Sequence, residues 1–408
     1  MPAYSGRFQY LDGGGTAVQQ GACEVHFDRE TLTVTPAAGT ALALDLGDVD
    51  RCAAADWDLT LQLYTGKQIQ LRQFGPAFGR MCGELLAAWR DRAVHCLMLE
   101  DLEEAARFQG AVNGEAAEIR IYGSNLAVLP QAGLAAQWRL AELESMDFDE
   151  SRYVYTLVSG ERRLAIGKLG PKTGEFGETL GATVQALRRH AAEILHQAFP
   201  FLDVDRLQRL VTLAPEGRSV KLAELAQIHT DLPEALVARA VDEPLQPYFD
   251  WLKQRAKADG LMTGFKFIRP DEAAAAAEAE EGDGGGGGDA GQQPLFFWFF
   301  FPLAGRDVAA WEATTGSGRA TYLFRAGAPV EDAIARLTRG LALVNFRREP
   351  VYLPDTSLDR EARYHRYAIG RRRIPELAEL RGAFLGRAIH SSLEAWQGQV
   401  AQAAGIPG

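Results

Sequence analysis

The chain has 408 residues, of which 47% are hydrophobic and 24% are charged, so it is long enough and apolar enough for two to four globular domains. Its formal net charge of −11 at pH 7 argues against a protein that coats nucleic acid or an anionic membrane along its whole length. The longest apolar run, residues 295–303, is much shorter than the roughly 20 residues that span a bilayer, so we expect no membrane span.

Residues 7–73 alternate between short apolar segments and turn residues, which predicts an antiparallel meander. The period then becomes helical, because Phe78, Met81, Leu85 and Trp89 fall on one face of a helix. The expected strands are residues 8–11, 23–27, 32–35, 41–46, 49–53, 59–64 and 67–71.

The segment of residues 23–92 is repeated 94 residues later in the chain. Both copies continue through two strands to a Gly-Pro pair, Gly75-Pro76 or Gly170-Pro171, and then a helix. Such a shared order of apolar, turn and glycine positions indicates an internal repeat, with a second copy over residues 108–199. The matched positions include Val25, Val34 and Leu46 in the first copy and Ile119, Val128 and Leu140 in the second.

A meander of about seven strands followed by one amphipathic helix can curl toward a barrel whose open end the helix covers. In this meander, in the segment of residues 44–49, in the hairpin at residues 65–67 and in the closing helix, the first hundred residues resemble the pleckstrin-homology-like (PH/GRAM) superfold. The resemblance implies two tandem PH-like domains, residues 1–100 and 108–199. Superfold members that bind phosphoinositides carry a basic cluster in an early loop, and the early turns here have none, so phosphoinositide binding is not expected.

The rest of the chain is predicted to hold three further parts. Residues 204–258 read as a helical connector, in which Pro233 and Pro244 suit helix starts. Residues 261–345 read as a third β/α unit, which we interpret as a reduced, PH-like third copy because it ends in a hairpin, Pro329 and a helix. Its alanine-, acid- and glycine-rich segment 271–293 is predicted to be a disordered loop. Residues 346–408 form a basic arm with a final helix over residues 377–396.

The basic arm offers the best candidate for a binding patch. Between Asn345 and His390 there are ten arginines, no lysine and six carboxylates. Arginine forks beside aromatic rings suit phosphate, RNA or an acidic protein surface, whereas a solvated segment that pairs with the protein's own acidic domains is the alternative. The candidate residues are Arg360, Arg363, Arg366, Arg371, Arg372 and Arg373 with Tyr364 and Tyr367, and His365 lies among them.

Other local patterns have two interpretations each. The aromatic run of residues 296–301 is either a strand covered on both faces within the protein or a strand that offers one face to a partner. The pairs Gly79/Gly83 and Gly177/Gly181 are either positions of close helix packing or the floor of a ligand groove.

No spacing typical of a catalytic, metal or cofactor site is present, and the seven histidines are dispersed, so we expect no catalytic residues, no metal and no cofactor. The four cysteines form no metal-binding pair, and the first residues show no basic segment followed by an apolar one. We therefore expect reduced thiols in a cytoplasmic protein.

The predicted fold class is α+β: tandem PH-like rolled antiparallel sheets, each closed by a C-terminal helix, plus a helical connector and a smaller β/α unit. The function that this favours is a non-enzymatic cytoplasmic binding or scaffold protein that recognises protein or peptide partners, or associates with itself. One alternative is a nucleic-acid-linked factor that uses the arginine cluster, since the layout is similar to the middle domains of the FACT histone chaperone. Another is an enzyme whose site combines scattered residues such as Glu24, His26, Asp56 and Glu118.

Overall fold

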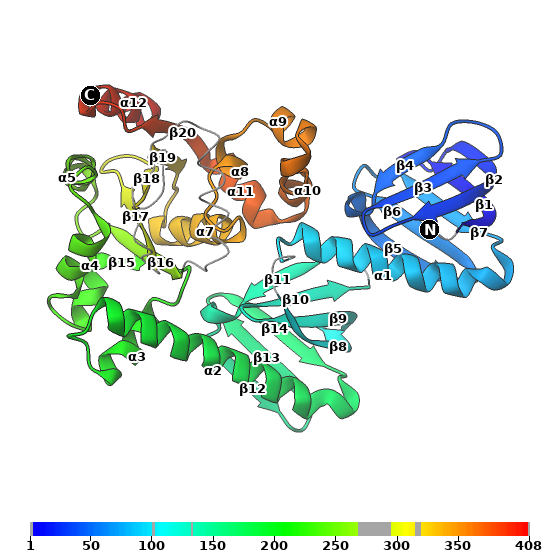
Figure 1. The fold of residues 1–408 in the computed structure, drawn as a ribbon, viewed down its shortest axis with the longest axis horizontal. Helices are drawn as coiled ribbons and strands as arrows, with labels where there is room; N and C mark the ends of the chain where they lie inside the picture. Colours follow the sequence, from blue (N-terminus) through cyan, green and yellow to red (C-terminus); the bar gives the residue numbers. More distant parts are fainter. Residues whose placement is uncertain (1–2, 100–102, 132–133, 268–294, 315–319, 407–408) are drawn as a thin grey trace. The chain divides into compact units, whose positions relative to one another are not determined.

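The computed structural model describes residues 3–99, 103–131, 134–267, 295–314 and 320–406. The predicted disordered loop, 271–293, lies outside the described residues. The chain divides into two compact units, the first made of Met1–Val184 with Leu358–Ile374 and the second of Gln185–Ser357 with Pro375–Gly408. The first unit contains two curled antiparallel seven-stranded sheets and the second a six-stranded sheet, with helices following them (Figure 1). The predicted α+β fold class is confirmed.

The first roll, residues 4–96, is a seven-stranded antiparallel sheet in the order β4-β3-β2-β1-β7-β6-β5. A short 3-10 helix, η1 (Leu46–Asp48), joins β4 to β5, and a second, η2 (Gly75–Ala77), leads into the closing helix α1 (Phe78–Cys96). The strands are β1 (Tyr4–Leu11), β2 (Ala17–Phe27), β3 (Thr31–Pro36), β4 (Leu42–Asp45), β5 (Val49–Ala55), β6 (Asp58–Leu63) and β7 (Gln68–Arg72).

The core of the first roll follows directly from the alternation in its strands. Val25, Val34 and Leu61 point inward and are fully buried, and Met81 and Leu85 of α1 are buried against them. Each such side chain contributes about 1.5–3 kcal/mol relative to an exposed one. The helix therefore owes its place to its apolar stripe, as the helical period predicted.

The second roll, residues 104–184, repeats the first element for element, with the order β11-β10-β9-β8-β14-β13-β12. This confirms the internal repeat. The closing helix α2 (Thr173–Ala198) begins in the first unit and ends in the second. The preceding elements are β8 (Glu104–Val112), β9 (Glu115–Tyr122), β10 (Asn125–Pro130), β11 (Ala136–Arg139), η3 (Leu140–Glu142), β12 (Ser145–Asp149), β13 (Val154–Ser159), β14 (Arg162–Gly167) and η4 (Gly170–Lys172).

The two rolls contact each other through α1. Arg120 and Glu118 on β9 are buried, and Arg120 donates from Nη1 to Asp91 Oδ1 at 2.8 Å, while Arg90 Nη1 lies 3.6 Å from Glu118 Oε2. The buried arginine and glutamate also pair with each other at 2.6 Å. Because breaking one partner of a buried pair leaves an uncompensated charge, this junction favours a single arrangement of the two rolls.

The second unit places one sheet between helices. Its strands run in chain order from β15 to β20, all antiparallel. They are β15 (Val220–Lys221), β16 (Met262–Phe267), β17 (Leu295–Pro302), β18 (Val308–Ala313), β19 (Ala320–Arg325) and β20 (Phe384–Ile389). The other elements are α3 (Val204–Leu213), η5 (Leu222–Gln227), α4 (Leu232–Ala240), α5 (Gln246–Arg255), α7 (Val330–Leu343), α8 (Glu349–Tyr352), α11 (Pro375–Ala383) and α12 (Leu393–Ala404).

Three sequence expectations for this unit need correction. The strand order differs from that of the rolls, so the third copy is not supported by topology, although the hairpin-to-helix ending is present. The predicted connector is no separate spacer, because its buried side chains share one core with the sheet. The predicted helix over residues 377–396 is wrong. Residues 384–389 instead form β20 beside β19, with Gly386, a poor helix former, in the middle of the strand.

The basic arm likewise does not form a domain of its own, since residues 358–374 belong to the first unit and the rest of residues 346–408 to the second.

The aromatic strand β17 is buried on both faces. Phe299 packs edge-to-face on Phe249 of α5, and Trp298 on the opposite face lies over Phe346, with ring centroids 4.2 Å apart. No residue of β17 is more than 9% exposed, so the interpretation of a strand covered within the protein is correct.

The glycine pairs differ between the two rolls. A Cβ on Gly177 would overlap the ring of Tyr155, so that glycine packs closely against the sheet, as predicted. A Cβ on Gly79 or Gly83 would meet nothing within 4 Å, so the close-packing interpretation is wrong for α1. Among the described helices, none is both long and apolar enough to cross a membrane.

Candidate functional site

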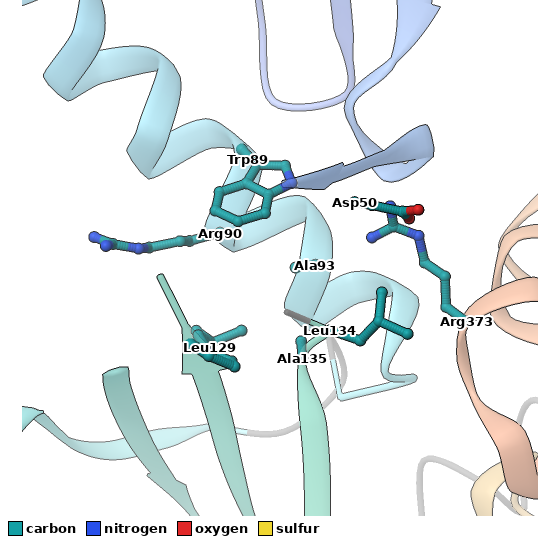
Figure 2. Close-up of a pocket in the computed structure, with 9 residues that line it drawn as sticks. Asp50, Trp89, Arg90, Ala93, Leu129, Leu134, Ala135 and Arg373 are labelled. Carbon is teal, nitrogen blue, oxygen red and sulfur yellow. The ribbon is translucent and has the colours of Figure 1, made fainter. Parts of the chain in front are cut away.

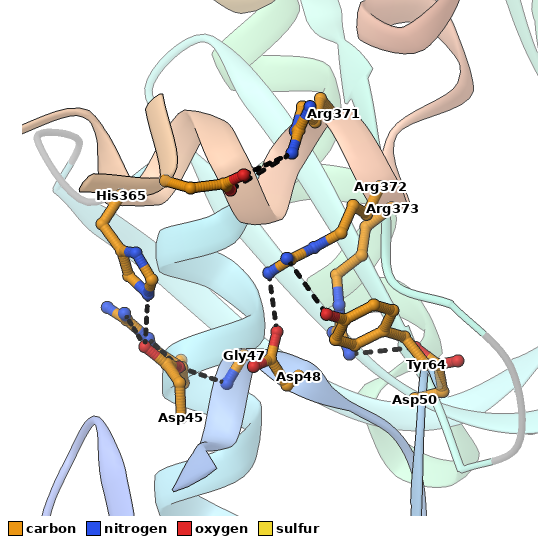
Figure 3. Close-up of polar contacts among 11 residues, drawn as sticks. Asp45, Gly47, Asp48, Asp50, Tyr64, His365, Arg371, Arg372 and Arg373 are labelled. Atoms are coloured by element: carbon orange, nitrogen blue, oxygen red, sulfur yellow. Dashed lines mark hydrogen bonds and ion pairs between the residues drawn. The ribbon is translucent and has the colours of Figure 1, made fainter. Parts of the chain in front are cut away.

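The central part of the arginine cluster lies on the first roll (Figure 3). Residues 358–374, which we call the clasp segment, contain the end of α9 (Asp355–Arg360), η6 (Ala362–Tyr364) and α10 (His365–Arg373). Arg372 Nη2 donates to Asp48 Oδ1 at 2.7 Å and Arg373 Nη2 to Asp50 Oδ1 at 3.1 Å. These partners are 324 and 323 residues apart in the sequence. The predicted alternative, pairing with the protein's own acidic residues, is therefore the observed one for these two arginines.

The carboxylates that receive the arginines come from the short connection between β4 and β5. Asp45 is the N-cap residue of η1, and its side chain accepts a hydrogen bond from the Gly47 amide at 2.6 Å. Asp48 ends η1 and Asp50 follows on β5. This capped turn projects three acidic side chains within six residues, and we call Asp45, Asp48 and Asp50, together with Tyr64, the acidic face.

Asp45 is also held in place by α1. Arg92 donates from Nε to Oδ1 at 2.9 Å and from Nη2 to Oδ2 at 2.6 Å, and its Nη1 reaches Glu30 at 3.0 Å. Burial raises the pKa of Asp45, but the hydrogen bonds and charge of Arg92 outweigh it, so this pKa lies below its ordinary value. His365 Nε2 of α10 lies 3.4 Å from the same carboxylate. Asp45 is therefore a fixed negative charge.

For Asp48, in contrast to Asp45, the effect of burial on the pKa is larger than the effect of the neighbouring arginine. Burial raises its pKa above the ordinary value, and the nearby Arg372 offsets this only in part. An ionised Asp48 consequently costs free energy when no cation covers it, which favours a positively charged ligand at this position.

Tyr64, at the turn between β6 and β7, completes the acidic face. The guanidinium carbon of Arg372 lies 4.3 Å from the centre of the Tyr64 ring, and Arg372 Nη1 donates to the Tyr64 hydroxyl at 3.3 Å. The arginine fork therefore contacts a carboxylate and an aromatic face together, an arrangement that lysine reproduces poorly.

Gly47 allows α10 to approach. A Cβ at this position would lie 2.8 Å from Ile369 Cδ1 and 2.7 Å from Asp45 Oδ1, closer than side chains tolerate. With no side chain at Gly47, Ile369 fits against this position and is fully buried. The contact of α10 with the first roll therefore combines an apolar side chain over a glycine with ion pairs around it.

The remaining predicted residues pair mainly within the clasp segment. Arg371 contacts Asp359 at 3.0 Å, and Arg363 contacts Glu361 at 3.0 Å. Two arginines lie over neighbouring tyrosine rings, Arg363 over Tyr364 at 4.6 Å and Arg366 over Tyr367 at 4.9 Å. Arg360 is exposed at the end of α9. The structure thus brings two of the six predicted arginines to the acidic face and leaves the other four elsewhere on the segment.

A small hollow lies beside the Arg373–Asp50 pair (Figure 2). It contains about 270 Å³ of space, part of it open to solvent, and Trp89 forms one wall, with its indole N–H donating to the Val49 carbonyl at 2.8 Å. The second roll contributes the apolar side chains of Leu129, Pro130, Leu134 and Ala135. Its size is below the usual range for a small-molecule site, and its one acid, Asp50, already pairs with Arg373.

Neither protein-family models nor curated proteins match this sequence.

The residues named for a scattered enzyme site occupy different surroundings. His26 and Glu24 lie together on β2, 3.8 Å apart, whereas Glu118 is buried against Arg120 in the junction. Asp56 lies in the turn between β5 and β6, with a positive φ of 50°. Within the part of the chain that the structure describes, no three His, Cys, Asp or Glu side chains are grouped to hold a metal ion.

Sequence reasoning missed the receiving side of the site. The segment of residues 44–49 supported the fold resemblance, but its carboxylates were not assigned a role. The available signal was the three aspartates at positions 45, 48 and 50, directly after an alternating strand, in a chain that also carries an arginine-rich segment.

Proposed function

We propose that the protein is a non-enzymatic cytoplasmic scaffold that binds a protein partner through the acidic face of its first roll. The observation that carries this proposal is the occupation of that face by a basic helix from a distant part of the same chain. A surface that recognises α10 by two ion pairs, a cation–π contact and an apolar contact has the chemistry of a peptide-binding site.

Two further observations support the proposal. The junction around Arg120 favours one arrangement of the two rolls, so a partner bound to the first would be held at a defined position beside the second. All four cysteines are unpaired, buried thiols, as expected in a reducing compartment.

Nucleic acid is the alternative ligand of the arginines. Arg372 and Arg373 already pair with the carboxylates of Asp48 and Asp50 in the folded chain. A phosphate group could bind these arginines only after displacing the two carboxylates. Protein binding through the acidic face is therefore the better supported function.

The test is affinity capture from the native host with three full-length chains. These are the unaltered chain, the double variant Asp48→Asn/Asp50→Asn, and the matched control Glu142→Gln/Glu144→Gln at the equivalent positions of the second roll. We expect the unaltered chain and the control to retain the same stoichiometric protein partner and the acidic-face variant to lose it, with all three melting normally. The proposal would be contradicted if the acidic-face variant captured the same partner as the unaltered chain, or if the unaltered chain remained a monomer without a partner at micromolar concentration.

A further inference from the structure

The clasp segment shows what kind of partner the acidic face accepts, and it competes for the same place. We infer that α10 is a resident occupant of a site that also takes an arginine-bearing helix of another protein, and that the two exclude each other. This inference rests on the proposed function and adds to it the chemistry of the partner and the regulation of the site.

The pattern that the partner must carry can be taken from α10. His365 contacts Asp45, Ile369 contacts Gly47, and Arg372 contacts Asp48, so residues four and seven apart along the helix contact the acidic face. These spacings belong to one face of an α-helix. Arg373, the next residue, reaches Asp50. The partner is therefore a helix with a basic residue, an apolar residue four positions later, and two consecutive arginines three and four positions after that.

The face is ready to receive such a helix. Arg92 holds Asp45 from within the roll, and the Gly47 amide donates to the same carboxylate, so neither contact depends on α10. A receptor that keeps its geometry when empty spends little free energy on ordering itself when a ligand binds.

The bonds of α10 to the face are of a kind that another helix can replace. The side chains of Arg372 and Asp48 are 24% and 26% exposed and His365 is 43% exposed, whereas Arg373 is more enclosed, at 10%. Ion pairs that stay in contact with water, as the Arg372–Asp48 and His365–Asp45 pairs do, are individually weak. Because α10 is covalently connected to the first roll, its effective concentration at the acidic face is on the order of millimolar. A partner helix that makes a few additional contacts can therefore displace α10 at a concentration below millimolar.

The first experiment uses the full-length chain and, as the probe, a fluorescent peptide that copies residues 358–374. In the chain, Arg372→Gln/Arg373→Gln weakens the docking of α10 without changing the carboxylates that receive it, and we call this variant the opened chain. Fluorescence anisotropy at low salt should show the peptide binding this variant at least tenfold more tightly than the unaltered chain. The control variant Arg360→Gln/Arg363→Gln, whose substitutions lie away from the acidic face, should bind the peptide as the unaltered chain does. Equal affinity for all three chains overturns the inference.

Two further measurements guard against misfolding and non-specific charge attraction. A peptide carrying glutamine at the positions of Arg372 and Arg373 should bind none of the chains, and tight binding of that peptide overturns the assigned chemistry. In the unaltered chain, saturating peptide should speed amide hydrogen exchange in residues 365–373, because the resident helix is displaced. Unchanged exchange at saturation overturns the competition.

The outcomes separate this inference from the proposed function. If the acidic face captures a partner in the affinity experiment but the opened chain does not bind the peptide, the scaffold function stands and the basic-helix inference is wrong. If the opened chain binds the peptide but the acidic face captures no partner, α10 is a structural contact of this chain alone, and the proposed function is wrong.

Discussion

The two rolls share every strand and their closing helix, yet their surfaces differ at the connection after the fourth strand. The first roll has Asp45, Gly47, Asp48 and Asp50 there, and the second has Arg139, Ala141, Glu142 and Glu144 at the equivalent positions, 94 residues later. In the second roll Arg139 lies 3.5 Å from Glu142, so this copy neutralises its own acid.

The same comparison extends to the supporting helix and to the steric fit. Gly47 corresponds to Ala141, and because the Gly-Pro pairs before the two closing helices are 95 residues apart, Arg92, which fixes Asp45, corresponds to Leu187. Duplication therefore repeats the backbone of this connection, while a few side chains decide whether a basic helix such as α10 packs against it. Four substitutions test this distinction, and the largest expected effect comes first.

Removing Arg92 should have the largest effect. Arg92→Met leaves Asp45 partly buried with no guanidinium beside it, so we expect the free energy of unfolding to fall by about 3–5 kcal/mol. Urea unfolding followed by tryptophan fluorescence measures the change. Arg80→Met, which removes an exposed i,i+4 pair with Glu84, should leave it nearly unchanged. Similar losses for the two variants would show that Arg92 has no special role.

Neutralising Asp45 should have a smaller effect that depends on pH. Because the folded pKa of Asp45 is below its ordinary value, its ionised form stabilises the fold above that ordinary pKa, and this stabilisation disappears as pH falls through the folded pKa. Asp45→Asn should therefore cost about 2 kcal/mol at pH 7. The difference from the unaltered chain should shrink below about pH 4, as thermal melting across pH would show. A difference that stays constant down to pH 2 would contradict the assignment.

Adding a side chain at Gly47 should weaken the packing of α10 on the first roll and moderately lower the free energy of unfolding. Gly47→Ala places a methyl group against Ile369 and the Asp45 carboxylate, and we expect a loss of about 1–2 kcal/mol together with faster hydrogen exchange in residues 365–373. The reciprocal change Ala141→Gly in the second roll should leave that exchange unaffected. If Gly47→Ala leaves exchange in α10 unchanged, the close approach of the helix is not needed for docking.

Asp48 should matter least for stability, despite its ion pair. Its raised pKa means that the ionised form is disfavoured in the folded chain, and this unfavourable contribution disappears as pH falls through the folded pKa. In Asp48→Asn the loss of the Arg372 contact and the relief of that cost oppose each other, so we expect a change within about 1 kcal/mol. Affinity of the opened chain for the peptide of residues 358–374 should nevertheless fall, whereas Glu142→Gln, at the equivalent position of the second roll, should leave that affinity unchanged.

Both rolls could be predicted from the sequence because their signals are local. Alternation in the strands, turn residues at each gap and the apolar stripe of α1 all arise from residues close together in the chain. The order of the third sheet could not be predicted, because β20 pairs with β19 across 60 to 69 residues of sequence and looks like part of a helix until that pairing is known.

The candidate site also has one half that the sequence could predict and one half that it could not. Composition alone found the arginine-rich segment, including Arg372 and Arg373. Their partners, Asp48 and Asp50, lie more than 320 residues earlier, and no sequence period connects such distant positions. The aspartates in η1 look like ordinary turn chemistry, so only the folded arrangement distinguishes a capping residue from a receptor for a helix.

The chain passes from the first compact unit to the second, returns to the first for residues 358–374, and then re-enters the second. A proteolytic cut or a premature stop after the second roll would thus yield an N-terminal fragment whose acidic turn has lost its covalent companion. During synthesis the ribosome completes both rolls long before it reaches Arg372, so every new molecule passes through an interval in which Asp48 and Asp50 lack their arginine partners.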